Sequence, residues 1–339
     1  MSEQKPPYLI IRLSSMGDVA LTMPVLDYLL THHGPSCTDY ITKKAFKPLI
    51  EHHPAAHHVY ILDENLSIGK LRGIIRKNKY ATILDLHKNL RSYLLTLGFR
   101  HVHRIKKEII KRFLLSKFKI YKPPYPHVTQ KYLKTLGVHE DVIPSSSLYI
   151  PSEEEIRPEN RDHYTQWKSG MRNLILAPGA SKPSKMLPLE TWEKVLKDIS
   201  REWDHILIIG NGETETAWAA KISQGNRALM NMTNRLTLRE LMLFISRGTL
   251  FAGNDSGPAH LAALCGIKTI VIFGQTVPEY GFAPLNSPSL IEPPIHLVCR
   301  PCSHLGFDQC PEKHHLCMRS IDAQTIINEI RYLLRKKSI

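Results

Sequence analysis

The chain has 339 residues, 42% of them hydrophobic and 22% charged, a composition that excludes a disordered chain and a small disulfide-stapled scaffold. This length exceeds what one hydrophobic core usually fills, so we expect two domains. The first seven residues are polar, and no apolar run approaches the roughly 18 to 20 residues of a membrane span. We therefore expect a cytoplasmic protein, with its six cysteines kept reduced or bound to metal.

Positive charge is concentrated in one stretch of the chain. Between Lys70 and Lys134 there are 18 Lys and Arg residues against two acids, Asp85 and Glu108, so this stretch carries +16 and the remainder sums to −2. Such a charge density attracts an anionic partner, whether nucleic acid, anionic lipid head groups or a phosphorylated glycan. The alternative is a solvated face without a partner.

Short apolar runs alternate with amphipathic patterns, which is typical of parallel α/β units. In the first half we expect strands at Tyr8–Leu13, Asp39–Thr42, Val59–Leu62 and Ala81–Leu86, and helices at Val19–His32 and Leu90–Gly98. The second half predicts strands at Asn173–Gly179, His205–Gly212, Thr249–Gly253 and Lys268–Gly274, and helices at Leu189–Ser200, Glu213–Ser223, Thr237–Ser246, Ser256–Cys265 and Asp322–Lys337.

A Pro-, Ser- and Glu-rich segment at 142–160 indicates a linker between the two halves. The predicted domains are therefore 1–160 and 161–321, followed by a C-terminal helix in 322–339 that we expect to pack back on the N-terminal domain. Doubly wound domains bind ligands beyond the carboxyl ends of their strands. Functional residues are thus expected in the strand-to-helix loops, within a cleft between the domains.

The first such loop is Ser14–Asp18, in which Gly17 permits a close backbone approach to a ligand. Asp18 is the acid of this loop, and a carboxylate there could take a proton from a hydroxyl group. On loop chemistry alone, the favoured alternative is that Asp18 is the N-cap of a helix that starts at Val19. The loop does not match the G-x-G-x-x-G pattern of dinucleotide-binding proteins.

Two loops of the second half suit an anionic ligand. In the first, Gly179, Ala180 and Ser181 leave room for an anion, and Lys182 and Lys185 supply positive charge, although a pair of loop lysines can also be merely solvated. The second loop reads D-S-G-P-A-H at Asp255–His260. Asp255 could cap the following helix, whose first N–H groups would bind a diphosphate, and His260 is either a ligand contact or a core histidine.

The tail from Cys299 to Cys317 contains one C-x-x-C pair followed by wider spacings. This is a partial zinc signature, since structural zinc sites usually show two close pairs. Its ligands would be Cys299, Cys302, Cys310 and Cys317. The alternative is a loop of reduced thiols without a metal.

Several motifs together resemble glycosyltransferase family 9, the ADP-heptose:lipopolysaccharide heptosyltransferases. They are R-L-S-S-M-G-D-V at Arg12–Val19, D-L-H-K-N-L-R-S at Asp85–Ser92, P-G-A at Pro178–Ala180 with Lys185 just before M-L-P, G-N-D-S-G-P-A-H-L-A-A at Gly253–Ala263, and the C-x-P-C…C…C-M tail. The resemblance runs from about Tyr8 to Ile321. The chain departs from the family pattern in having K-M-L-P at Lys185–Pro188 and His87 in place of a common Gln.

The resemblance implies a GT-B architecture, with two Rossmann-like domains that hold the acceptor and the nucleotide sugar, and an inverting transfer from ADP-heptose that needs no metal or other cofactor. By position, Asp18 matches the catalytic base, and Lys185 with the helix N-terminus near Ser256 would stabilise the leaving ADP. The implied donor-binding residues are Gly179, Ala180, Ser181, Glu213, Asp255, Ser256, Gly257 and His260.

The same resemblance gives the basic stretch a partner, the anionic lipopolysaccharide core at the cytoplasmic leaflet, so we expect peripheral, salt-sensitive membrane association. Candidate acceptor-binding residues are Ser15, Met16, Gly17, Lys88, Arg91 and Arg104, with Lys106, Lys107, Lys111 and Arg112 as further basic side chains. Two alternatives remain at this point: a GT-B transferase with another nucleotide sugar, and a basic nucleic-acid-binding protein, although the chain has no helix-turn-helix, finger or RNP-like motif.

Overall fold

The computed structural model describes residues 6–63, 67–119, 125–138, 145–286 and 288–336, without the side chains of residues 109–112. It separates into two compact units. Unit 1 comprises Met1–Glu108 and Pro126–Pro151, and unit 2 comprises Ile109–Tyr125 and Ser152–Ile339. The change of unit after Pro151 falls inside the segment that the sequence indicates as a linker, and unit 2 also takes a short piece of the basic stretch.

Unit 1 is built on a five-stranded parallel sheet with strand order β3-β2-β1-β4-β5. Its elements are β1 (Tyr8–Ile11), α1 (Met16–Ala20), α2 (Met23–His33), β2 (Thr38–Thr42), β3 (Ala56–Ile61), α3 (Ile68–Asn78), β4 (Thr82–Asp85), α4 (Leu90–Thr96), β5 (Val102–Arg104) and α6 (Val128–Leu133). One face of the sheet packs Leu9 and Ile11 of β1 against Leu71 and Ile75 of α3.

The helix predicted at Val19–His32 is interrupted in the structure. It is divided into α1 and α2, and Pro24 lies in the first turn of α2. Proline has no N–H to donate, and its ring clashes with the carbonyl four residues earlier in a continuous helix. A single helix across this position is therefore disfavoured, and a new one begins at Met23.

Unit 2 contains a six-stranded parallel sheet with strand order β11-β10-β9-β6-β7-β8. Its elements are α5 (Ile109–Phe118), α7 (Pro158–Gln166), β6 (Asn173–Ala177), α8 (Leu189–Ile199), β7 (His205–Ile208), α9 (Glu213–Ile222), β8 (Leu229–Asn231), α10 (Leu238–Ser246), β9 (Leu250–Asn254), α11 (Gly257–Leu264), β10 (Lys268–Ile272), β11 (Ser289–Ile291), α12 (Leu316–Arg319) and α13 (Ala323–Arg335).

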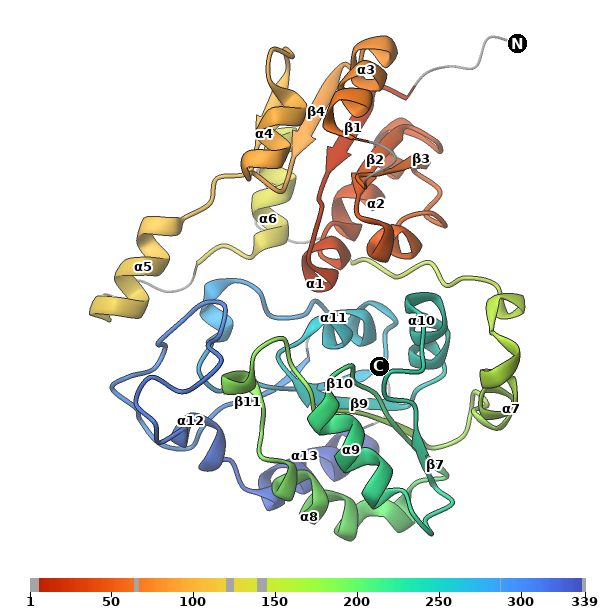
Figure 1. The fold of residues 1–339 in the computed structure, drawn as a ribbon, viewed down its shortest axis with the longest axis vertical. Helices are drawn as coiled ribbons and strands as arrows, with labels where there is room; N and C mark the ends of the chain where they lie inside the picture. The colour runs from red at the N-terminus through yellow and green to blue at the C-terminus, as the bar shows by residue number, and fades with distance from the viewer. Residues whose placement is uncertain (1–5, 64–66, 120–124, 139–144, 287, 337–339) are drawn as a thin grey trace. The chain divides into compact units, whose positions relative to one another are not determined.

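The final helix belongs to the core of unit 2. The sequence led us to expect it against the N-terminal domain, but α13 packs beside α8 (Figure 1). Its apolar stripe of Ile326, Ile327 and Ile330 lies in one hydrophobic cluster with Trp192 of α8 and Leu174 of β6. Burial of this stripe stabilises unit 2 because each aliphatic side chain removed from water contributes about 1.5–3 kcal/mol.

Candidate functional site

In each sheet the strand order reverses direction at one point, which is where doubly wound folds bind ligands. In unit 1 the reversal lies between β1 and β4, which are neighbours in the sheet (Figure 1). Ile11 at the end of β1 is in register with Asp85 at the end of β4. The loops that follow these two strands therefore begin side by side, and they carry the motifs that contain Asp18 and His87.

The carboxylate of Asp18 is held on both of its oxygens. Oδ1 forms an ion pair with Nη2 of Arg12 at 2.7 Å. Oδ2 accepts hydrogen bonds from the hydroxyl of Ser15 at 2.9 Å and from the backbone N–H of Ser15 at 3.2 Å. Ser15 is the N-cap of α1, and Asp18 occupies the third helical position rather than the cap. The N-cap role that the sequence left open for Asp18 is thus taken by Ser15.

Arg12 belongs to the site as well, although the sequence did not indicate it as a functional residue. Its guanidinium is almost fully buried and also donates to the carbonyl oxygens of Ser14 and Leu86, at 2.8 and 2.6 Å. The link to Leu86 ties the loop after β1 to the loop after β4. The signal was present in the R-L-S-S-M-G-D motif, in which Arg12 lies at the end of a buried strand.

The environment of Asp18 favours its ionised form. Burial by itself would raise the pKa of this carboxyl group, but the Arg12 charge and the Ser15 hydrogen bonds outweigh burial and lower the pKa below its ordinary value. The Asp18 charge likewise contributes to raising the pKa of Arg12 against the effect of burial. Asp18 is therefore a carboxylate at neutral pH, and its side chain remains partly accessible to solvent.

The loop after β4 is organised by the buried carboxylate of Asp85. It accepts hydrogen bonds from the backbone N–H groups of His87 and Lys88 and from the hydroxyl of Ser92. Burial and the charges of Arg12 and Lys107 lower the pKa of His87 to about 4, so its ring is neutral at pH 7. Its Nδ1 is buried and has no hydrogen-bond partner among the described residues. A neutral imidazole with an unused nitrogen thus lies at the same switch point as Asp18.

The other predicted acceptor-binding residues occupy different positions around this point. Met16 and Gly17 form the first turn of α1, Lys88 lies in the loop after β4, and Arg91 is exposed on α4. Arg104 is already engaged: it donates to the hydroxyl of Thr96 at 2.8 Å and lies over the ring of Tyr93. The side chains of Lys111 and Arg112 are outside the described residues.

In unit 2 the switch point lies between β6 and β9, where Ala177 is in register with Gly253. Asn254, at the end of β9, joins the two loops. Its side-chain amide donates to the carbonyl of Pro178 at 2.6 Å and accepts from the backbone N–H of Leu187 at 3.1 Å. Asn254 is fully buried, and these bonds fix both ends of the loop that carries Lys185.

Lys185 and Asp255 form an ion pair across this switch point. Their Nζ and Oδ2 atoms are 2.5 Å apart, and both side chains are largely buried. The same Oδ2 accepts a hydrogen bond from Thr276 at 3.0 Å. The N-cap of α11 is Ser256, so Asp255 does not cap this helix as the sequence suggested. Its carboxylate instead contacts Lys185 and holds this side chain in place in the loop after β6.

The start of α11 offers a second group to an anion. The hydroxyl of Ser256 is buried and has no hydrogen-bond partner within the part of the chain that the structure describes. It lies beside the first N–H groups of an eight-residue helix, where the helix dipole favours negative charge. His260 is buried one turn further along α11. Ala180 is half-buried and Ser181 is exposed in the loop after β6.

Two acids begin α9, and they differ in burial. Glu213 is exposed at the first helical position, whereas Glu215 is buried and accepts a hydrogen bond from the N–H of Gly212 at 2.9 Å. Glu215 also approaches Gly179 so closely that a Cβ there would collide with its carboxylate. Gly179 is therefore needed for close contact between the loop after β6 and the first turn of α9. Glu215 is a second site residue that the sequence did not indicate.

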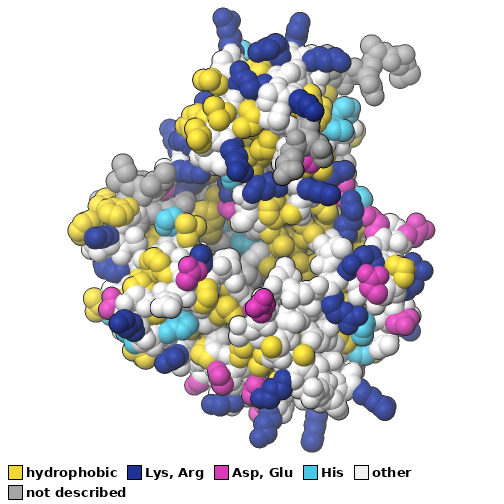
Figure 2. All heavy atoms as spheres, in the orientation of Figure 1, with side chains coloured by type: hydrophobic (Ala, Val, Ile, Leu, Met, Phe, Trp, Pro, Cys, Tyr) yellow, Lys and Arg dark blue, Asp and Glu magenta, His cyan; other side chains and the backbone are white. Residues whose placement is uncertain are grey.

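The described residues contain neither a preformed metal site nor a membrane-spanning helix. No three His, Cys, Asp or Glu side chains among them form a group ready to hold a metal ion. Within the same ranges, no helix has both the length and the apolar character needed to cross a bilayer. Figure 2 shows the dark-blue Lys and Arg side chains spread over the face of unit 1 in view, with few acidic side chains among them.

Comparison with known proteins identifies similar sequences. The profile described as glycosyltransferase family 9 (heptosyltransferase) matches residues 68–306. Lipooligosaccharide heptosyltransferase 2 of Campylobacter jejuni is 33% identical over 177 residues, covering 51% of this chain and 54% of that protein. The chain thus matches about half the length of this relative. Lipopolysaccharide heptosyltransferase 1 of Campylobacter coli is 27% identical over 301 residues, covering 80% of this chain and 84% of that protein.

Solved structures show the same fold. The structure of Escherichia coli ADP-heptose lipopolysaccharide heptosyltransferase II superposes with a TM-score of 0.72 at 17% identity, covering 96% of this chain and 98% of that chain. E. coli heptosyltransferase WaaC with ADP gives 0.65 at 14% identity, covering 96% and 99%. With the two parallel sheets described above, these likenesses confirm the α/β, GT-B fold class predicted from the sequence.

Proposed function

The chain belongs to glycosyltransferase family 9, the heptosyltransferase family, and on that premise we propose that it transfers heptose from ADP-heptose to the inner core of lipopolysaccharide with inversion at the anomeric carbon. Asp18 is the general base, and Lys185 with the N-terminus of α11 stabilises the departing ADP. The transfer requires no metal ion. The observation that carries this proposal is that each sheet presents one half of the required chemistry at its switch point.

The proposed acceptor half is the Asp18 site. Attack on the anomeric carbon requires the acceptor hydroxyl to lose its proton, and a carboxylate that is ionised and partly accessible can receive it. Arg12 and Ser15 hold the carboxylate in one orientation. The neutral ring of His87 would form a hydrogen bond with a second hydroxyl group of the acceptor sugar, which would help to orient that sugar.

The proposed donor half is the Lys185 site. As the sugar–phosphate bond breaks, negative charge grows on the diphosphate, and fixed positive groups lower the barrier. The ammonium group of Lys185 forms an ion pair with Asp255, which directly precedes α11. The hydroxyl of Ser256, the N-cap of α11, has no hydrogen-bond partner among the described residues. We assign Gly179, Ala180 and Ser181 to the same anion site, Glu213 or Glu215 to the ribose hydroxyls, and Gly257 and His260 to the sugar diphosphate.

The basic surface and helix α4 favour the proposal that the acceptor is bound at a membrane. Exposed apolar side chains lie along α4 and just after it, including Leu90 at 76% and Leu97 at 64% exposure, and Arg91 is exposed on the same helix. Apolar and cationic side chains together suit an anionic bilayer surface. We therefore propose peripheral association with the cytoplasmic leaflet, where the lipopolysaccharide core is assembled.

The direct test is release of ADP from ADP-heptose in the presence of a heptose-acceptor core. Asp18→Asn should abolish turnover while ADP binding, measured by a thermal shift, is retained. The matched control is Asp162→Asn, a change on α7. Turnover at the wild-type rate in Asp18→Asn would remove Asp18 from the mechanism. A larger thermal shift with UDP or GDP than with ADP would redirect the proposal to another nucleotide sugar.

A further inference from the structure

The turn that follows β10 brings a hydroxyl group to Asp255. Thr276 is only 4% exposed, and its hydroxyl donates to Oδ2 of Asp255 at 3.0 Å. Strands β9 and β10 are neighbours in the sheet, and the backbone N–H of Asp255 donates to the carbonyl oxygen of Ile272 at 3.0 Å. The carboxylate and the hydroxyl therefore meet because the two strands end together. The reaction proposed above gives Thr276 no part.

The oxygen that Thr276 contacts is the one that also binds Lys185. Nζ of Lys185 lies 2.5 Å from the same Oδ2, and the side chains of Lys185 and Asp255 are both largely buried. A carboxylate oxygen has about two positions for hydrogen-bond donors, so a hydroxyl and an ammonium group together fill those of Oδ2. A hydrogen bond to an ionised group is about twice as strong as one between neutral groups. Thr276 thus gives Asp255 a strong partner that does not depend on Lys185.

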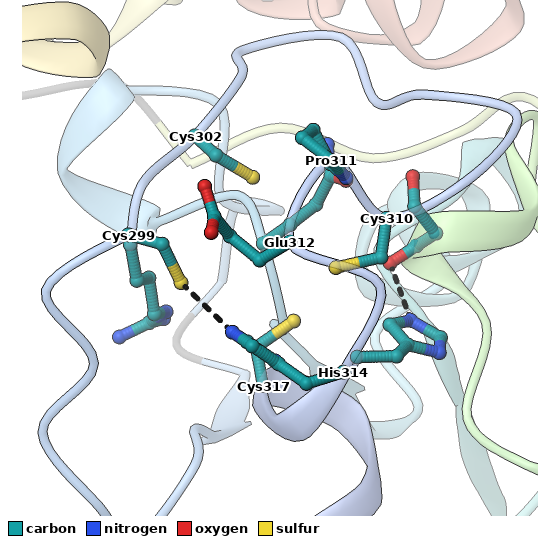
Figure 3. Close-up of a pocket in the computed structure, with 11 residues that line it drawn as sticks. Cys299, Cys302, Cys310, Pro311, Glu312, His314 and Cys317 are labelled. Atoms are coloured by element: carbon teal, nitrogen blue, oxygen red, sulfur yellow. Dashed lines mark hydrogen bonds between the residues drawn. The ribbon is translucent and has the colours of Figure 1, made fainter.

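The turn itself is fixed by Arg300. Its Nε donates to the carbonyl oxygen of Gly274 at 2.6 Å and its Nη2 to that of Thr276 at 3.2 Å, while the same guanidinium forms an ion pair with Glu292. Arg300 lines the cavity shown in Figure 3, in which the labelled Cys299 directly precedes it in the chain. A planar guanidinium offers its donors in a fixed geometry, so Arg300 holds the backbone on both sides of Gln275.

We propose that Thr276 is a positioning residue for donor binding: its hydroxyl retains the Asp255 carboxylate when Lys185 turns from it to the diphosphate. Arg300 fixes the turn from which Thr276 acts. The inference rests on the proposed function, because the diphosphate is the ligand that takes Lys185 from Asp255.

The exchange of partners at Lys185 explains why a hydroxyl is useful there. When Lys185 moves to the diphosphate, Asp255 loses its cation, and a largely buried carboxylate without a partner destabilises the site. The hydrogen bond from Thr276 remains and compensates part of this loss. It also keeps the carboxylate from following Lys185 toward a ligand of the same charge. Without the hydroxyl, Asp255 would depend more heavily on Lys185, and the diphosphate would have to break a tighter ion pair.

Thr276→Val tests the inference because it keeps the branched shape of the side chain and removes the hydroxyl. We expect the Kd for ADP, measured by isothermal titration calorimetry, to rise about tenfold, as the loss of a hydrogen bond to a charged group implies. KM for the donor should rise in parallel, whereas kcat should change little. Thr276→Ser restores the hydroxyl and should return both Kd and KM close to their wild-type values.

Thr269→Val is the matched control. Thr269 is buried on β10, and its hydroxyl donates to the carbonyl oxygen of Ile267 at 2.9 Å. This change also removes a hydrogen-bonded hydroxyl from the same strand, but it should leave the Kd for ADP unchanged. An equal rise of Kd in Thr269→Val and Thr276→Val would attribute the effect to general destabilisation of β10 and overturn the proposal.

The role of Arg300 is tested through non-additivity. Arg300→Lys should raise the Kd for ADP in the same direction as Thr276→Val. Adding it to Thr276→Val should cause no further rise, because groups that act through one contact are not additive. Fully additive changes in log Kd would show that Arg300 acts independently of Thr276.

A measurement without ligand separates this inference from the proposed function. Thr276→Val should raise the unfolding equilibrium constant about tenfold in the wild-type background, and much less in the Asp255→Ala background, where the carboxylate is missing. Equal effects in both backgrounds, or an unchanged Kd for ADP in Thr276→Val, would overturn the inference. If Asp255→Ala does not fold, the Kd values of the Val and Ser variants decide. A wild-type chain that binds no nucleoside diphosphate would contradict the proposed function, and the unfolding measurements would still show whether Thr276 holds Asp255.

Discussion

Replacing Arg12 by methionine separates the charge state of Asp18 from its position. The side chain remains long and apolar, but Asp18 loses its cationic partner, and the carbonyl oxygens of Ser14 and Leu86 lose their donor. Breaking a buried ion pair on one side costs about 3–5 kcal/mol of unfolding free energy. Because water reaches part of the Asp18 side chain, we expect about 3 kcal/mol, measured by urea unfolding at pH 7.

The pH profile carries the mechanistic part of this prediction. Without Arg12, burial raises the pKa of Asp18 above its value in the wild-type chain. Since the base must be ionised, the acid limb of kcat/KM should move to higher pH. A carboxyl group with a lowered pKa stabilises the fold at pH values above its unfolded-state pKa and loses this contribution as the pH falls through its folded-state pKa. The stability difference between the two proteins should therefore shrink in acid.

The matched control is Arg76→Met, which removes an exposed arginine of α3 and should leave both the pH profile and the stability unchanged. An acid limb that stays at the wild-type pH in Arg12→Met would refute the reasoning that Arg12 sets the ionisation of Asp18. A shift of equal size in Arg76→Met would mean that the general field of the basic surface is responsible instead.

Four further changes test separate contacts. Lys185→Ala should lower kcat by about 10² to 10³ because it removes a positive charge that stabilises the departing ADP. Lys197→Ala, on the exposed side of α8, should leave kcat unchanged, and equal kcat in the two variants would exclude Lys185 from leaving-group stabilisation. Gly179→Ala should destabilise the protein by about 1–3 kcal/mol and raise KM for the donor, since its Cβ would collide with Glu215; an unchanged melting temperature would contradict this. His87→Gln should reduce the loss of stability between pH 6.5 and 4, because the pKa of His87, lowered to about 4 by burial, makes its protonation favour the unfolded chain; denaturant titrations at both pH values measure the difference. Leu90→Asp combined with Leu97→Asp should weaken sedimentation with vesicles containing phosphatidylglycerol, and binding that persists undiminished would remove α4 from the membrane surface.

The sequence predicts the central strands well because they are buried. Leu9, Ile10 and Ile11 of β1 are fully buried, so the strand is a continuous apolar run bounded by polar loops. The edge strands β5, β8 and β11 have only three residues each, which is too short for any periodic signal. Their positions are set by pairing with a neighbouring strand that is distant in the sequence, so the residues of the short strand alone do not reveal them.

The candidate site divides in the same way. Asp18, Lys185 and Asp255 stand in recognisable motifs, so their loops could be predicted from the chain alone. The partners could not. The contact of Arg12 with Leu86 spans 74 residues, and Glu215 reaches Gly179 only because β6 and β7 are adjacent in the sheet. Both pairings follow from strand order, which no local pattern encodes.

Both switch points contain a cation–carboxylate pair, but the reactive member of the pair differs between them. Each holds a cation and a carboxylate in contact: Arg12 with Asp18 at 2.7 Å, and Lys185 with Asp255 at 2.5 Å. In the proposed reaction the reactive member of the first pair is the acid, and Arg12 orients it while keeping it ionised. The reactive member of the second pair is the cation, and Asp255 holds it in place until a diphosphate arrives with more negative charge.

This exchange of roles has an energetic consequence. An unpaired charge in a partly buried loop destabilises the fold because its desolvation is not compensated. In the free protein, each reactive group is therefore paired with a counterion. The acceptor hydroxyl must compete with Ser15 for Asp18, whereas the diphosphate must compete with Asp255 for Lys185. Asp255→Asn should therefore strengthen the binding of ADP while leaving Lys185 less well oriented, so that KM and kcat fall together. If affinity for ADP fell instead, Asp255 would have to contact the donor directly.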